Sequence, residues 1–204
     1  MRIQPIVEGH GDVPSVPILL RRLSSEAHEY GIQINKSIRQ SATKLYTQDG
    51  IQKAVELARR QECSAILIIV DSNDHCPKEI APDLAGWARQ AAGDIPCAMV
   101  IAHREFEAWF LATIESLRNR SGLLANAASE VDPESIRGAK EALERRMAGG
   151  QSYFERTDQP ALTQAFDMRV AYQKCRSFRK LVKCFGELAI ANGINLNPWP
   201  PLRW

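Results

Sequence analysis

A run of six apolar residues, "AILIIV" at 65–70, ends directly at Asp71. A short, continuous apolar run of this kind is typical of a strand that is buried on both faces of a parallel sheet. A second such run, "CAMVI", occupies residues 97–101. Two strands of this type constrain the fold strongly, because both faces of their sheet must be covered by helices to keep them from water.

The first half of the chain alternates between strand and helix patterns. Weaker strand patterns lie at 2–7 and 32–38, and helix patterns lie at 13–23, 50–61 and 80–92. This alternation predicts an α/β fold with a doubly wound, mainly parallel sheet of four strands joined by right-handed crossovers.

The second half of the chain is predicted to be helical. We expect helices at 105–119 and 132–147 and a long amphipathic helix at 169–193, followed by a Pro-rich tail whose two Trp lie over the body of the protein. The chain is therefore predicted to consist of an α/β core at 1–104 and a helical extension at 105–204 that packs on it.

The composition is that of an ordinary globular protein, with 45% hydrophobic residues, 25% charged residues and a net charge of +2. This charge does not require a nucleic-acid partner, so nucleic-acid binding would need a local basic patch. No stretch approaches the roughly 20 apolar residues that cross a bilayer, and the five Cys are scattered without a CxxC pair. We expect a cytoplasmic protein without a signal peptide, a disulfide framework or a membrane partner.

Polar side chains follow the predicted strands at the points where the strands end. They are Glu8 and Asp12 after the first strand, Asp71, Asn73 and Asp74 after the third, and Glu105 and Glu107 after the fourth. Because ligands bind beyond the carboxyl ends of parallel strands, these side chains are expected to meet at one edge of the sheet. Carboxylates crowded in this way repel one another unless cations neutralise them. The pattern predicts one or two Mg²⁺ or Mn²⁺ ions, which would activate water for attack on a phosphodiester.

Each of these acids also has a simpler interpretation when it is taken singly, because strand-end Asp and Glu often cap helices or turns. Glu105 and Glu107 point to the same side only if the backbone is extended, and a helix that began at Arg104 would separate them. The glycines of "EGHG" allow the turn that presents Glu8 more readily than they form a nucleotide cradle. The His and Cys residues near the strand ends match no known zinc spacing.

A basic stretch near the C-terminus predicts a surface for nucleic acid. Residues 169–186 contain six Lys and Arg residues and no acid. A helix face that carries these positive charges would bind a phosphate backbone. A solvated helix face is an equally good interpretation. The predicted nucleic-acid contacts are His10, Arg169, Arg176, Arg179, Lys180 and Lys183.

Several motifs resemble the bacterial DUF4276 family. They are "VEGHGD" with "VPILLRRL", "DSND.CP", "HREFEAWFL", "YFERTDQPALT..FD" and "C.SFRKL". The N-terminal part of that family is similar to the TOPRIM domain of topoisomerases, primases and OLD-family nucleases, which carries a Glu after the first strand and a D-x-D after a later one. Glu8 and Asp71 match these positions, but Asn73 stands where the second Asp belongs, which lowers the expected affinity for metal.

The resemblance to OLD-type nucleases implies further site residues. Those nucleases add an acid four residues past the first Glu, a later acid-x-acid pair and a downstream Lys. The matching positions are Asp12, Glu105, Glu107 and Lys140. The resemblance therefore implies a metal-dependent nuclease in which Glu8 and Asp71 are catalytic and Lys140 stabilises charge in the transition state.

The same resemblance implies partners. Proteins of this kind resemble accessory nucleases that work beside an ATPase of the ABC or SMC type, in defence against phage or other foreign DNA. A homo-oligomer is left open. The alternative to an enzyme is a non-catalytic TOPRIM-like subunit that binds nucleic acid or an ATPase.

Overall fold

A parallel β-sheet forms the centre of the protein, in a computed structural model that describes residues 1–204. The strands are β1 (Arg2–Val7), β2 (Gln33–Ile34), β3 (Ile38–Arg39), β4 (Ala65–Asp71) and β5 (Cys97–Ala102). The order is β2-β1-β4-β5, β3 also pairs with β1, and all pairs are parallel. The predicted fold class is confirmed, although the strand expected at 32–38 consists of two short segments along one edge of β1.

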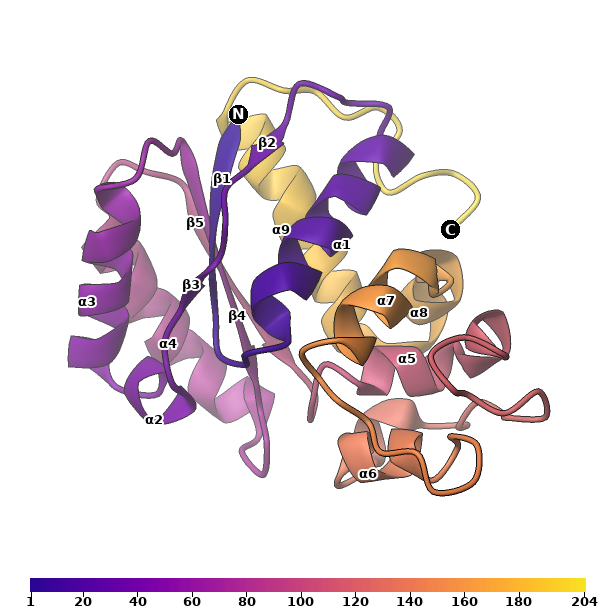
Figure 1. The fold of residues 1–204 in the computed structure, drawn as a ribbon. Helices are drawn as coiled ribbons and strands as arrows, with labels where there is room; N and C mark the ends of the chain where they lie inside the picture. Colours follow the sequence, from indigo (N-terminus) through magenta and orange to yellow (C-terminus); the bar gives the residue numbers. More distant parts are fainter.

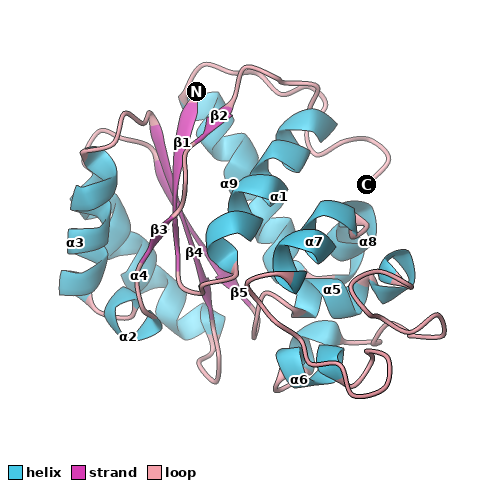
Figure 2. Cartoon of the chain, in the orientation of Figure 1, coloured by secondary structure: helices cyan, strands magenta, loops and turns pink.

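Helices cover both faces of the sheet, and the second half of the chain consists of helices joined by loops, two of them long (Figures 1 and 2). Those of the first half are α1 (Asp12–Glu26), α2 (Ala42–Leu45), α3 (Gln48–Arg59) and α4 (Pro77–Ala92). Those of the second half are α5 (Ala108–Ala112), the 3-10 helices η1 (Ile114–Leu117) and η2 (Pro133–Ser135), α6 (Ala139–Glu144), α7 (Asp158–Ala165), α8 (Met168–Lys174) and α9 (Arg176–Ala191).

Strand β4 is buried on both faces, as its apolar run predicts. Alternate side chains of a strand point to opposite faces of the sheet. Leu67 and Ile69 belong to a large core with α1 and α9, whereas Ile66 and Ile68 belong to a smaller core with α3 and α4. In Figure 1, α3 and α4 lie on one side of the sheet, and α1 and α9 lie on the other. The larger core joins residues of both predicted regions of the chain.

The three helices predicted in the second half are all interrupted. The first is divided into α5 and η1, the second into η2 and α6, and the third into α8 and α9. The third break falls at Cys175, whose φ of −108° and ψ of 120° are extended. At this break, Glu134 of η2 takes the place of the preceding helical turn as hydrogen-bond acceptor for the start of α9. Its carboxylate accepts from the backbone N–H groups of Arg176 (2.7 Å) and Ser177 (2.8 Å).

This cap predicts a large stability effect for a residue outside the acidic centre. Glu134 is only 6% exposed, so Glu134→Ala leaves buried N–H groups of α9 without an acceptor. We expect a loss of about 2–3 kcal/mol in the free energy of unfolding, measured by urea denaturation. Glu187→Ala on the exposed face of α9 is the control and should change stability by about 0.5 kcal/mol or less. Equal effects of the two substitutions would contradict the capping role.

The C-terminal tail lies over the body of the protein, as predicted. Trp199 donates from Nε1 to the carbonyl of Val182 at 2.9 Å, and its ring lies 5.4 Å from that of Phe185. The ring centroids of Trp204 and Phe178 lie 6.4 Å apart. None of the helices combines the length and the apolar character that a membrane crossing requires.

Candidate metal centre at the carboxyl edge of the sheet

The two acids predicted to be catalytic lie together at the carboxyl edge of the sheet. Glu8 follows β1 and Asp71 ends β4, and the backbone N–H of Asp71 donates to Oε2 of Glu8 at 3.3 Å. The side chain of Asp71 accepts from the backbone N–H of Phe106 at 2.9 Å through Oδ1. The end of β1, the end of β4 and the segment that follows β5 therefore meet around Asp71.

Asp12 joins this edge from the first turn of α1 and is only 6% exposed. Its Oδ2 accepts from the backbone N–H of Gly9 at 2.8 Å, and its Oδ1 accepts from Nε2 of Gln159 at 2.6 Å. A Cβ added at Gly11 would lie 1.9 Å from Oε1 of Gln159. The glycines of "EGHG" thus leave room for the carboxylate of Asp12 and the amide that holds it.

Glu105 and Glu107 approach the centre just before α5 begins at Ala108. Glu105 accepts through Oε2 from the backbone N–H of Lys140 at 3.0 Å. Glu107 is 1% exposed and accepts through Oε1 from the hydroxyl of Tyr153 at 3.1 Å, while its Oε2 has no hydrogen-bond partner. An unpaired buried carboxylate oxygen is costly unless a cation or a proton satisfies it.

Lys140 is the lysine of this edge, and its Nζ lies 3.6 Å from Oε2 of Glu155. Burial alone would lower the pKa of Lys140, but the negative charges of Glu107, Glu155 and Asp71 outweigh burial and raise the pKa. Lys140 therefore stays protonated at neutral pH.

The carboxylates are harder to ionise than isolated acids. Burial raises the pKa of Asp71 well above its ordinary value, and repulsion from Asp12, Glu107 and Glu8 raises it further. Burial likewise raises the pKa of Glu107, to about 8. Burial also raises the pKa values of Glu8 and Asp12, although hydrogen bonds lower them in part. Perturbation of several acids at one edge of a sheet is typical of a functional site.

Asn73 and Asp74 differ in their relation to this centre. Asn73 has a φ of +50°, and a hydrogen bond from its amide lowers the pKa of Glu8 in part. Asp74 is exposed, and its Oδ1 pairs with Arg104 at 3.1 Å and with Arg137 at 3.4 Å. Asp74 therefore lies apart from the buried acids with which it was predicted to bind metal.

The predicted nucleic-acid contacts differ in whether their charges already have partners within the protein. Arg169 of α8 pairs with Asp167 at 3.8 Å, and Lys183 of α9 pairs with Glu187 at 3.6 Å. The guanidinium of Arg179 donates to the carbonyls of Tyr172 and Gln173. Of the predicted contacts, the exposed side chains without an ion pair are His10, Arg176 and Lys180.

The sequence interpretation missed several side chains that contact the acids and Lys140. Tyr153 donates to Glu107, Gln159 donates to Asp12, and Glu155 pairs with Lys140; all three lie within the motif "YFERTDQP". Tyr46 was also missed, and its hydroxyl donates to the backbone carbonyl of Asp71. The cluster of polar side chains in that motif was a visible signal. The sequence could not indicate which acid these side chains contact, because Gln159 and its partner Asp12 are 147 positions apart.

In this arrangement, no three His, Cys, Asp or Glu side chains form a ready-made metal-binding group. Most of the carboxylate oxygens described above accept hydrogen bonds from backbone or side-chain donors instead. A cation would therefore bind through carboxylate oxygens that accept no hydrogen bond, such as Oε2 of Glu107.

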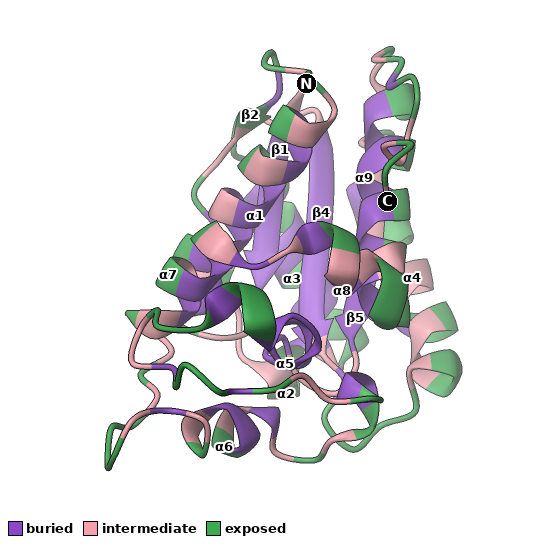
Figure 3. Ribbon diagram, turned by 90° about the vertical axis from the view of Figure 1, so that its right-hand side faces the viewer, coloured by how far each residue is buried: buried purple, intermediate pink, exposed green.

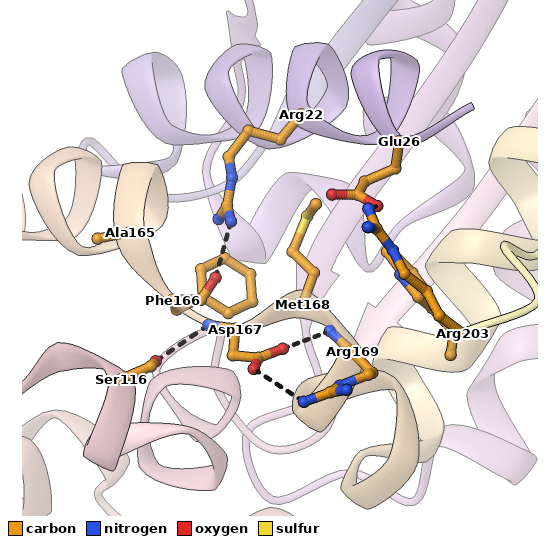
Figure 4. A pocket seen from close by; sticks show the side chains of 10 residues that line it. Arg22, Glu26, Ser116, Ala165, Phe166, Asp167, Met168, Arg169 and Arg203 are labelled. Carbon is orange, nitrogen blue, oxygen red and sulfur yellow. Dashed lines mark hydrogen bonds and ion pairs between the residues drawn. The ribbon is translucent and has the colours of Figure 1, made fainter. Parts of the chain in front are cut away.

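A separate cavity of about 440 Å³ lies between α1, the start of α8 and the C-terminal tail (Figure 4). Its three guanidinium groups are already paired. Arg22 donates to the carbonyl of Phe166, and Arg203 and Arg169 pair with acids. This cavity offers little unused charge and lies away from the acidic edge.

The sequence model of a family described as a domain of unknown function, DUF4276, matches residues 7–184. The chain belongs to the DUF4276 family. Comparison with curated proteins and with solved structures finds no match. The matched range of this DUF4276 protein contains the whole acidic centre, from Glu8 to Gln159.

Proposed function

We propose that this protein is a nuclease that depends on Mg²⁺ or Mn²⁺ and hydrolyses phosphodiester bonds of nucleic acid. The observation that carries the proposal is the excess of acids over cations at the carboxyl edge of the sheet. The acids that surround Lys140 there are Glu8, Asp12, Asp71, Glu105, Glu107 and Glu155. One lysine cannot balance six ionised carboxylates, and the pKa values of Glu8, Asp12, Asp71 and Glu107 are accordingly raised. A divalent cation would replace the protons that these acids retain.

The donor set fits a hard cation, because its ligand atoms are carboxylate and amide oxygens. The unpartnered Oε2 of Glu107 supports the fit. When bound, the metal would supply an activated water molecule and charge neutralisation at the phosphate. Among the protein groups, Glu8, with its raised pKa, is suited to accept a proton. Lys140 would stabilise negative charge that develops on the phosphate.

Thermal denaturation tests the metal site directly. At about ten times its dissociation constant, Mg²⁺ or Mn²⁺ should stabilise the protein by about 1.4 kcal/mol, which raises Tm by about 3–6 °C. The Asp71→Asn variant should not respond. Asp74→Asn, which removes an exposed carboxylate that pairs with Arg104 and Arg137, should respond like the wild type. A wild-type Tm that ignores both ions would remove the metal site from the proposal.

A non-catalytic subunit is the second candidate, and Asn73 favours it. TOPRIM nucleases carry an acid at this position, and an amide brings no charge to the metal. A screen for Mn²⁺-dependent cleavage of plasmid, single strands and tRNA separates the two candidates. By family resemblance we further propose an ABC- or SMC-type ATPase as a partner and a role in defence against foreign DNA.

A further inference from the structure

A groove of about 470 Å³ lies between the start of α4, the end of β5 and the start of α9. These three elements lie together on one side of the molecule in Figure 3. Lys78, Arg176 and Lys180 line the groove, and none of them forms an ion pair. Pro77 and Ala81 of α4 contribute apolar surface to it, together with Met99 and Ile101 of β5, which are each 7% exposed. The groove thus combines an apolar wall with three free positive charges.

The only carboxylate among the lining residues forms no ion pair with these three side chains. Glu134 is buried and accepts from the backbone N–H groups of Arg176 and Ser177 and from the hydroxyl of Ser177. Its oxygens are therefore directed to the backbone of α9 rather than to the lysines. The cavity in Figure 4 is different, because acids and carbonyls pair with its arginines.

The groove is connected to the acidic centre through His103. This residue lines the groove, and its Nδ1 lies 3.0 Å from Oγ of Ser72. Ser72 directly follows Asp71, and His103 precedes Glu105 by two positions. The groove and the buried acids therefore share the ends of β4 and β5.

We propose that this groove binds the sugar–phosphate backbone of a single nucleic-acid strand and leads it to the acidic centre. Lys78, Arg176 and Lys180 bind phosphates, and the apolar wall formed mainly by Pro77 and Ala81 contacts the apolar faces of sugars or bases. The inference rests on the proposed function for the kind of ligand. It goes beyond that function by placing the strand and by separating the binding residues of α9 from Arg179 and Lys183, which lie outside the groove.

The test is fluorescence anisotropy with fluorescein-labelled single strands of DNA and RNA about 20 nucleotides long, in EDTA so that no metal-dependent cleavage occurs. Arg176→Ala and Lys180→Ala should each weaken binding by about 5- to 10-fold and reduce the slope of log K against log salt by about 0.7. Lys183→Ala is the matched control, because it removes the same charge from the same helix outside the groove. It should weaken binding less than about 2-fold.

Three results would each contradict binding in the groove. The first is wild-type protein that binds neither strand, and the second is a groove variant that binds like the wild type. The third is a Lys183→Ala variant that loses as much affinity as Lys180→Ala. Circular-dichroism melting confirms that each variant is folded. If the groove variants lose affinity but the wild type never cleaves, the nuclease function is rejected and the binding of a strand in the groove is retained. If the wild type cleaves but the groove variants bind normally, binding in the groove is rejected and the nuclease function is retained.

Discussion

Cleavage of nucleic acid should fall by about 10²- to 10⁴-fold in the Asp71→Asn variant, the range seen when a group that stabilises the transition state is removed. Asp71 lies within the electrostatic reach of Glu8, Asp12 and Glu107, so it is the acid most central to the proposed metal site. Asparagine keeps the oxygen that accepts from Phe106 N–H. The substitution therefore removes charge while it retains the local hydrogen bond. Initial rates of Mn²⁺-dependent cleavage measure the effect.

Asp74→Asn is the matched control for this experiment. It makes the same chemical change three residues away, at an exposed side chain that pairs with Arg104 and Arg137. Its cleavage rate should stay within about 3-fold of the wild type, since exposed ion pairs contribute about 1 kcal/mol or less. A loss at Asp74 as large as the loss at Asp71 would contradict the geometry of the proposed centre. Cleavage by Asp71→Asn at the wild-type rate would exclude the centre as the catalytic site.

Without metal, the protein should lose stability as the pH rises from about 5 to 8. Burial raises the pKa of Glu107 from 4.5 to about 8, so the folded state holds a proton that the unfolded state releases. The stability linked to this proton is fully present below about pH 4.5 and is lost as the pH rises through 8. The raised pKa values of Asp71, Glu8 and Asp12 act in the same direction. We expect a decrease on the order of 2–4 kcal/mol in the free energy of unfolding.

Urea denaturation in EDTA across this pH range measures the effect. Glu107→Gln removes the titrating group, and its amide oxygen can still accept from Tyr153, so this variant should show a flatter profile than the wild type. Asp74→Asn should keep the wild-type profile. A Glu107→Gln profile as steep as that of the wild type would show that Glu107 is ionised in the folded protein.

Local patterns in the sequence were sufficient to predict the sheet and its acidic edge. The run at 65–70 has no polar residue, which is typical of a strand that helices cover on both faces, and the structure divides its side chains between two cores. The direction of parallel strands then places Glu8 and Asp71 at the same edge. These inferences succeed because burial and strand polarity are properties of short segments.

The sequence by itself therefore determined the α/β class, the parallel sheet and the edge to which the acids belong. Only the tertiary structure decided which acids meet and what holds them. Gln159 and Tyr153 reach Asp12 and Glu107 from a helical region remote in sequence, and Glu134 ends the predicted long helix at Cys175 by capping α9. The physical reason is that a buried polar group must find a partner wherever the packed chain supplies one, and the periodicity of a single segment carries no information about that partner.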